Sequence, residues 1–215
     1  VREGDAISPF YDSMIAKLIV HGDTREQALA RLDAALAQTH IVGLATNVQF
    51  LQYVLATDSF RRARLDTALI PREADHLFQQ DRLGLPLTVA AAVARTLLDE
   101  RSAQVPGDPF SRRDGWNSHG QAERVFDFDY GGQHHAARLS YLHDGALRLR
   151  VDGSEGLLDF RPLADGTLDL LYAGQRERVQ VYARGEAMHV FARRDASQVL
   201  EVDLIAHAGE GASEG

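Results

Sequence analysis

The sequence predicts an α+β fold: a small mixed α+β domain, followed by an eight-stranded antiparallel β-barrel around a long apolar helix. From residue 123 to 204, short runs of alternating apolar and polar residues are separated by turn signals such as Gly131-Gly132, Asp144-Gly145 and Asp152-Gly153, which is typical of an up-and-down meander. Ahead of them, residues 85–101 form a helical pattern with almost no polar face, and such a helix has to be buried. Eight strands can close around an interior filled by side chains. An open sandwich with the helix across one face is the alternative.

Composition and charge limit the function classes. The chain has 215 residues, of which 45% are apolar and 25% charged, so one or two modest packed cores are expected. Its formal net charge of −8 disfavours nucleic acid as a partner. The sequence contains no cysteine, and we find no membrane span and no secretory signal. Disulfides and thiolate nucleophiles are therefore excluded, and the cytoplasmic location is the default expectation.

The first domain is expected to begin with strands and to continue with helices. Residues 7–21 carry apolar and β-branched side chains and end at Gly22-Asp23, which predicts strand, turn and strand. A helix follows, because Thr24-Arg25-Glu26-Gln27 has the form of a capping box and apolar residues recur after it at helical spacing. The polar face of this helix, which includes Arg25 and Arg31, is expected to be solvated or to lie at an interface.

Further along, the pattern predicts short helical elements and a linker. A second helix is expected to start from a cap at Thr46 or Asn47. A short apolar element at residues 66–70 is expected to stop at Pro71, and the charged stretch 72–82 is predicted to be a linker or an exposed helix.

These elements predict two domains and a tail. The domains span residues 1–80 and 84–206, and residues 207–215 have the composition of a flexible linker. The chain begins without a methionine and almost at once in a strand-like run. We therefore expect it to be a piece of a longer protein.

Several motifs carry a resemblance to a known family. The stretches Tyr11-Asp12-Ser13-Met14-Ile15-Ala16-Lys17-Leu18, Gly22-x-Thr24-Arg25-x-x-Ala28 and Gly43-Leu44-x-Thr46-Asn47 are similar, in order and spacing, to the carboxyl-terminal domain of biotin carboxylases. The later motifs Asp108-Pro109-Phe110-Ser111 and Asp114-Gly115-Trp116, with the strand-rich remainder, resemble the domain that mediates contact between biotin carboxylase and carboxyltransferase (the BT domain) in acyl-CoA carboxylases. Within that group the resemblance is strongest to 3-methylcrotonyl-CoA carboxylase α subunits.

The resemblance implies a parent enzyme of the ATP-dependent ligase class. In that family the α subunit carboxylates biotin with ATP, bicarbonate and Mg or Mn, and a separate carboxyltransferase (β) subunit passes the carboxyl group to an acyl-CoA. The family's BT domain is a long helix wrapped by an eight-stranded antiparallel barrel. Propionyl-, acetyl- and geranyl-CoA carboxylases are the alternative parents.

This chain itself is expected to be inactive alone. It has no glycine-rich phosphate loop and no catalytic lysines paired with metal-binding carboxylates, so no cofactor and no metal are expected on it. By resemblance, the remainder of the biotin carboxylase domain and a biotin carrier domain lie elsewhere in the parent chain. The family position that matches Asp12 lies in the wall of the biotin and bicarbonate site, where a carboxylate can hold an arginine in place. The alternative is that Asp12 only satisfies a turn.

One segment imitates a biotin attachment site. Glu186-Ala187-Met188-His189-Val190 is similar to the family's Glu-Ala-Met-Lys-Met sequence, but a histidine stands where the lysine would form the amide. The segment has strand spacing, and an ordinary strand is predicted. Lys17, the only lysine, lies in a strand-like run and is a poor acceptor. We therefore expect no biotin on this chain.

The loop at residues 104–121 is the predicted docking site. It has no periodicity and is longer than compact domains usually contain without a function. Aromatic and arginine side chains dominate interface hot spots, and loops of the family's BT domain contact the carboxyltransferase subunit. The alternative is that the tryptophan plugs one end of the barrel. The candidate partner-binding residues are Phe110, Arg112, Arg113, Asp114 and Trp116.

Other function classes have less support. A free-standing small-ligand-binding β-barrel is the main alternative, but the apolar helix would occupy its lumen. A hydrolase lacks its Gly-x-Ser-x-Gly elbow. Among nine histidines, the adjacent His134 and His135 are expected to point to opposite faces of a strand, so no metal site is predicted.

Overall fold

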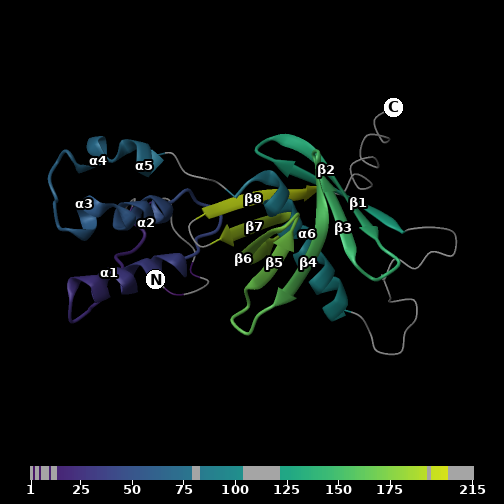
Figure 1. The fold of residues 1–215 in the computed structure, drawn as a ribbon, viewed down its shortest axis with the longest axis horizontal. Helices are drawn as coiled ribbons and strands as arrows, with labels where there is room; N and C mark the ends of the chain where they lie inside the picture. Colours follow the sequence, from purple (N-terminus) through teal and green to yellow (C-terminus); the bar gives the residue numbers. More distant parts are fainter. Residues whose placement is uncertain are drawn as a thin grey trace. The chain divides into compact units, whose positions relative to one another are not determined.

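A computed structural model describes residues 2, 5, 10, 14–78, 83–103, 122–192 and 195–202. The chain divides into two compact units, Val1–Gln80 and Asp81–Gly215. The first unit is built from helices and extended segments, and the second is built from one long helix and an antiparallel sheet (Figure 1). The predicted α+β class is confirmed.

Among the described residues of the first unit, five helices make up the regular structure. The predicted cap at Thr24 is confirmed, since its side chain accepts a hydrogen bond from the Gln27 amide at 3.2 Å. Asn47 precedes the second helix as predicted, but its side chain makes no capping hydrogen bond. The helices are α1 (Arg25–Ala37), α2 (Val48–Ala56), α3 (Asp58–Arg61), α4 (Leu69–Arg72) and α5 (Ala74–Phe78).

One prediction for this unit was wrong at its boundary. The element at 66–70 was expected to stop at Pro71, yet α4 continues through it to Arg72. Proline is tolerated there because amides in the first turn of a helix have no intrahelical partner. The stretch 72–82 was expected to be a linker or an exposed helix, and it contains the short helix α5, which leaves Phe78 exposed and buries only Leu77.

The strand prediction for residues 7–21 fails where it can be examined. Residues 14–21 form no strand, and no described segment pairs with them. A strand needs a neighbour to satisfy its backbone amides and carbonyls, and β-branched composition alone cannot supply one.

In the second unit, the described residues form α6 (Leu85–Ala103) and eight strands. Each strand pairs antiparallel with the next, and β1 also pairs with β8. That last pairing covers three residue positions, whereas β1 and β2 pair over eight, so the curled sheet is joined narrowly at this seam. The strands are β1 (Glu123–Tyr130), β2 (Gln133–Tyr141), β3 (Leu147–Val151), β4 (Ser154–Pro162), β5 (Leu168–Tyr172), β6 (Gln175–Arg184), β7 (Ala187–Ala192) and β8 (Asp195–Val202).

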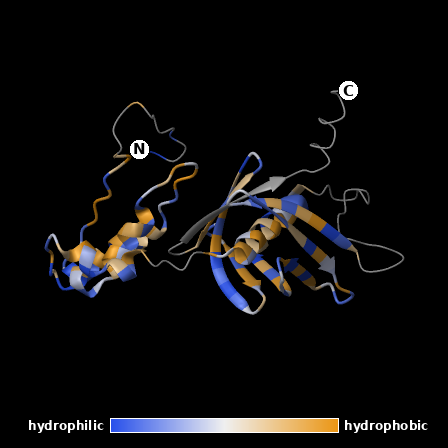
Figure 2. Cartoon of the chain, turned by 90° about the horizontal axis from the view of Figure 1, so that it is seen from above, coloured by the Kyte–Doolittle hydropathy of each residue, from blue (hydrophilic) through white to orange (hydrophobic). Residues whose placement is uncertain are grey.

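Strand alternation places apolar side chains on the inner side of the sheet. In β3, for example, Leu147, Leu149 and Val151 are buried while the two arginines between them are exposed. The hydropathy colouring in Figure 2 shows the same alternation along the strands around α6. The predicted meander and its period of two are therefore confirmed.

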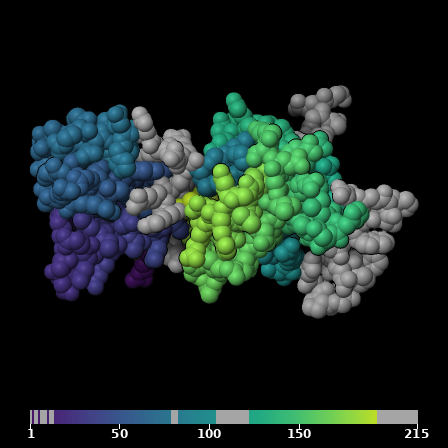
Figure 3. Space-filling view, in the orientation of Figure 1, coloured from purple at the N-terminus to yellow at the C-terminus, as the bar shows by residue number. Residues whose placement is uncertain are grey.

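α6 fills the space inside the sheet. Residues 89–94, which are valine and alanine only, have no exposed surface, and the space-filling view leaves mainly the ends of the helix visible (Figure 3). Alanine lets a helix backbone lie close to the strands, so the small residues suit a narrow interior. Pro86 occupies the first turn, as predicted. Among the helices that the structure describes, none combines the length and apolar character needed to cross a lipid bilayer.

Two tight hairpin turns bring the middle strands into register. Asp152-Gly153 and Ala173-Gly174 each have two consecutive positive φ values, which match the right-handed twist of the flanking strands. Between them in sequence, Gly156 of β4 lies so close to the turn after β5 that a Cβ there would stand 2.5 Å from the Cα of Ala173. Any larger residue at Gly156 would force β4 and β5 apart.

Candidate functional site

The candidate site residues predicted from the sequence lie outside the described residues. This applies to the biotin-site candidate Asp12 and to the five docking candidates, Phe110, Arg112, Arg113, Asp114 and Trp116. The structure describes what flanks them: the segment that follows Asp12, and the two elements that the docking loop connects.

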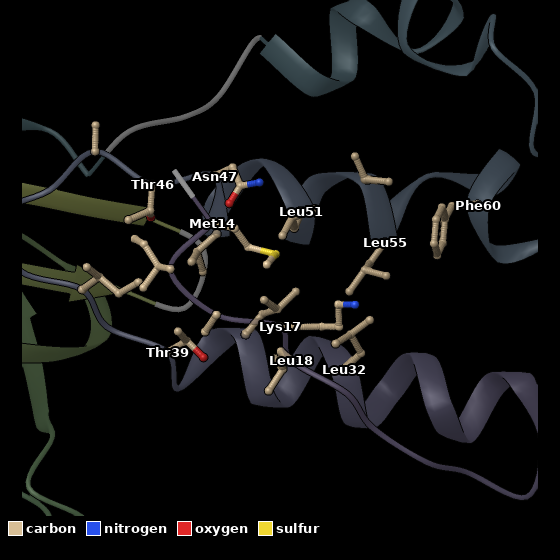
Figure 4. Close-up of a pocket in the computed structure, with 17 residues that line it drawn as sticks. Met14, Lys17, Leu18, Leu32, Thr39, Thr46, Asn47, Leu51, Leu55 and Phe60 are labelled. Atoms are coloured by element: carbon tan, nitrogen blue, oxygen red, sulfur yellow. The ribbon is translucent and has the colours of Figure 1, made fainter. Parts of the chain in front are cut away.

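After Asp12, the chain runs extended between α1 and α2. It forms one side of a cavity of about 680 Å³, and the Lys17 side chain stretches along it between the two helices (Figure 4). Most of the residues that line the cavity have apolar side chains. Met14 and Ile19 of the extended segment are mostly exposed. The principal linings are Met14, Ile15, Leu18, Leu32, Leu51 and Leu55.

This cavity can bind an apolar surface but has little chemistry to offer. Its polar linings include Thr39, whose hydroxyl already donates to the Ala35 carbonyl at 2.8 Å. Within the described ranges, no three histidine or carboxylate side chains gather in a way that could hold a metal ion.

Arginines on α1 have a structural role that the sequence did not indicate. The Arg25 guanidinium donates to the Phe60 carbonyl at 2.7 Å and lies over the Phe60 ring at 5.5 Å. Arg31 donates to the His21 carbonyl, which anchors the extended segment to α1. These side chains were expected to be solvated or at an interface; both are exposed, and they also donate to backbone carbonyls of neighbouring segments.

In the second unit, an ion pair ties together the ends of the predicted docking loop. α6 ends at Ala103 and β1 begins at Glu123. Just inside these ends, the Arg124 guanidinium donates to both oxygens of Glu100, at 2.7 and 2.8 Å. The side chains are only 29% and 18% exposed, so the bidentate pair is shielded from water.

The surroundings strengthen this pair. The hydrogen bond from Glu100 raises the pKa of Arg124 above its already high ordinary value. The guanidinium also lies 4.3 Å from the centre of the Phe126 ring, a cation–π contact. Nearby on α6, Arg101 lies over Phe160 at 5.2 Å. Sequence periodicity could not identify these contacts, because they join residues that are distant in the chain.

The paired histidines lie as the sequence predicted. His134 approaches Asp127 of β1 at 3.1 Å, while His135 contacts Asp152 in the turn between β3 and β4. Each ring therefore has its own carboxylate partner, on opposite sides of β2. The pair does not form a shared ligand set.

The segment that imitates a biotin attachment site is an ordinary strand, as predicted. Residues 187–192 form β7, and Met188, His189 and Val190 are buried. Burial lowers the pKa of His189, and the charge of Arg184 lowers it further. The described segment therefore has neither the chemistry nor the exposure of an attachment site.

Comparison with known families matches both units. The family described as "Biotin carboxylase C-terminal domain" matches residues 1–72. The family described as "Methylcrotonyl-CoA carboxylase, alpha-subunit, BT domain" matches residues 85–204, which is more than half of the chain.

Individual relatives agree with these families. The chain is 33% identical over 135 residues to the mitochondrial methylcrotonoyl-CoA carboxylase subunit alpha of Dictyostelium discoideum, covering 60% of this chain and 19% of that protein. It is 30% identical over 173 residues to the mouse protein of the same name, covering 77% and 24%. A biotin carboxylase of Halalkalibacterium halodurans is 43% identical over 70 residues, covering 33% and 16%.

This chain spans only about a quarter, or less, of the length of these three relatives. Its first unit matches the end of a biotin carboxylase domain, and its helix-filled sheet matches a BT domain. The chain therefore belongs to the biotin-dependent carboxylase α subunits, and within them to the family that carries the methylcrotonyl-CoA carboxylase BT domain.

Proposed function

We propose that this chain is part of an acyl-CoA carboxylase α subunit whose second unit docks the carboxyltransferase (β) subunit. Residues 1–80 contribute the carboxyl-terminal part of the biotin carboxylase domain, and residues 84–206 form the mediating barrel. The parent enzyme carboxylates biotin with ATP and bicarbonate and passes the carboxyl group to 3-methylcrotonyl-CoA.

The observation that carries the docking role is the match of residues 85–204 to a BT domain, combined with a barrel interior that α6 fills. A ligand-binding barrel needs an open lumen, whereas here residues 89–94 occupy the interior without exposed surface. This packing disfavours the small-ligand alternative. The Arg124–Glu100 pair supports the role, because it fixes both ends of the loop at 104–121.

The catalytic groups of the parent enzyme are assigned to other parts of its polypeptide. Lys17 is the only lysine, and a histidine stands at the imitated attachment position, so biotin is carried elsewhere. The described residues offer no three-ligand cluster for the metal that accompanies ATP. From this chain we assign only Asp12, as a carboxylate in the wall of the biotin and bicarbonate site.

The docking role is tested by co-purification of the full α subunit with its β subunit. The variant Trp116→Ala with Arg113→Ala should weaken the complex about tenfold or more, because central aromatic and arginine residues carry most interface energy. The matched control is Tyr182→Ala with Arg178→Ala, which removes one exposed aromatic and one exposed arginine elsewhere on the barrel.

Unchanged binding of the Trp116 and Arg113 variant would contradict docking through this loop. Failure of the unmodified subunits to associate would contradict the docking role itself. The substrate is tested separately, by comparing carboxylation of 3-methylcrotonyl-CoA and propionyl-CoA by the reconstituted parent enzyme.

A further inference from the structure

Three arginines gather on the outer side of the sheet, where four strands lie next to one another (Figure 1). The strand register aligns their side chains in two rows that run across β1, β2, β3 and β4. The first row contains Val125, Arg138, Arg150 and Glu155, and the second contains Glu123, Ser140, Arg148 and Leu157. We call Arg138, Arg148 and Arg150 the arginine face.

The register of these arginines is unfavourable for the isolated domain. Arg138 and Arg150 lie directly opposite each other on β2 and β3, and like charges at directly opposed positions destabilise a sheet. The alternation of the strands does not require arginine here, since any polar residue would serve on an outer face. Arginine at these positions therefore lowers the stability of the sheet and brings no evident benefit to folding.

The neighbouring carboxylates only partly offset this repulsion. Glu123 approaches Arg138 at 3.5 Å, and Glu155 approaches Arg150 at 3.3 Å and Arg148 at 3.9 Å. Three guanidinium groups thus share two carboxylates at long distances. Each guanidinium has five N–H donors, so much of their donor capacity faces water.

The ion pair between Arg176 and Asp169 on the same barrel has shorter contacts than those of the arginine face. Arg176 donates to Asp169 at 2.8 Å, and its guanidinium lowers the pKa of Asp169 to about 2. Arg176 and Arg161 lie 2.5 and 3.3 Å from the Asp169 carboxylate, whereas the ion pairs of the arginine face measure 3.3–3.9 Å. The arginines of both groups are exposed, so the arginine face is distinguished by its longer ion pairs and by the sharing of two carboxylates among three arginines.

Exposed apolar side chains flank the arginine face on two sides. Val125 on β1 is 47% exposed and Leu157 on β4 is 54% exposed. Arginine beside accessible apolar surface is the composition typical of a protein interface. The chain as a whole carries a net charge of −8, which makes a polyanion such as nucleic acid a poor occupant.

We propose that the arginine face is a second docking surface and binds an acidic surface of the carboxyltransferase subunit. This inference rests on the proposed function and extends it from the loop at 104–121 to the outer side of β1–β4. Outward side chains stand roughly 5 Å apart between strands and about 7 Å apart along one strand. Carboxylates four residues apart on a helix have a matching separation, so an acidic helix is the partner element that fits.

The test uses the full α subunit and its β subunit, with the variant Arg138→Gln and Arg150→Gln. Binding to the β subunit should weaken about tenfold and should depend less on salt, because two charge-assisted contacts are lost. The thermal midpoint of the free α subunit should stay the same or rise, since the opposed charges are removed. If the arginines only stabilised the fold, their loss would not lower the affinity while leaving the thermal stability equal or higher.

The matched control is Arg178→Gln with Arg184→Gln, two exposed arginines on β6 whose loss changes the net charge equally. It should bind within about twofold of the unmodified subunit. Equal binding by the Arg138 and Arg150 variant would overturn the inference while leaving the proposed function standing, because the unmodified subunits still associate. A lower thermal midpoint with unchanged affinity would also overturn it, as would self-association that only the unmodified α subunit shows.

Discussion

His189 is a titratable side chain that is buried although it lies on the outer side of the sheet. It lies opposite Tyr182 on the outer side of β7, yet it is only 8% exposed. Burial disfavours the charged imidazolium, and the nearby charge of Arg184 acts in the same direction. The folded protein therefore holds His189 neutral over a wider pH range than the unfolded chain does.

The first prediction is a pH dependence of stability carried by His189. Because its pKa is lowered on folding, the unfolded state takes up more protons below the ordinary histidine pKa of about 6.5, and the free energy of unfolding falls as pH decreases below that value. For one group, the slope cannot exceed about 1.4 kcal/mol per pH unit. The change in the free energy of unfolding is measured by denaturant unfolding of the second unit at several pH values between neutral and 5.

His189→Gln should flatten this dependence, because it removes the group whose pKa is lowered on folding. Identical pH profiles for His189→Gln and the unmodified protein would contradict the prediction.

At the scale of elements, the bidentate pair between Glu100 and Arg124 joins the end of α6 to the start of β1. It anchors the helix inside the sheet near the end where the strand begins. Removing one member would leave a partly buried charge without its partner, which costs more than the pair itself contributes.

The second prediction concerns the ion pair between Glu100 and Arg124. Glu100→Gln or Arg124→Met should each lower the free energy of unfolding by about 1–3 kcal/mol, and the double variant should cost less than the sum of the two. Urea unfolding of the second unit provides the measurement. The control is the exposed pair Arg95 and Asp99 on α6, whose loss should cost less than about 0.5 kcal/mol. Equal costs for the two pairs would refute a special role for Glu100 and Arg124.

The elements that could be predicted from sequence are those whose pattern is local. Period-two alternation identified β3, and the continuous apolar face of residues 85–101 identified α6 and its burial. The capping box identified the start of α1 because its hydrogen bond joins Thr24 to Gln27, three residues away. Each of these elements is determined either by contacts between residues a few positions apart or by a continuous hydrophobic pattern in the sequence.

The failures have a common physical cause, which is dependence on distant partners. Residues 14–21 have strand composition but no described neighbour to pair with. The Arg124–Glu100 tie joins residues that are 24 apart in sequence, and no periodicity connects them. The docking candidates on the loop at 104–121 and Asp12 lie outside the described residues, so these assignments stay predictions.

At the scale of the whole molecule, the two units have different kinds of core. The second unit buries one continuous cluster of apolar side chains around α6. In the first unit, an open pocket of about 680 Å³ lies between the extended segment, α1 and α2, and Met14 and Ile19 remain exposed. Apolar surface that stays in contact with water does not contribute to the free energy of folding, so the second unit should be the more stable of the two.

The third prediction is that the chain unfolds in two steps. The first unit should melt before the second, and isolated residues 81–215 should keep the strand signal in circular dichroism and the midpoint of the later transition. Scanning calorimetry of both forms measures this. A single cooperative transition in the whole chain, or loss of structure in residues 81–215 alone, would show that the units depend on each other.

The position of α6 in the chain has a consequence for biosynthesis. The helix precedes all eight strands that bury it, so it leaves the ribosome before any of them. At roughly 5–20 residues per second, several seconds pass before the last strand emerges. During that interval, the apolar surface of α6 has nothing to cover it. We therefore expect the protein yield to depend on chaperones that bind apolar helices, more than the stability of the finished barrel suggests.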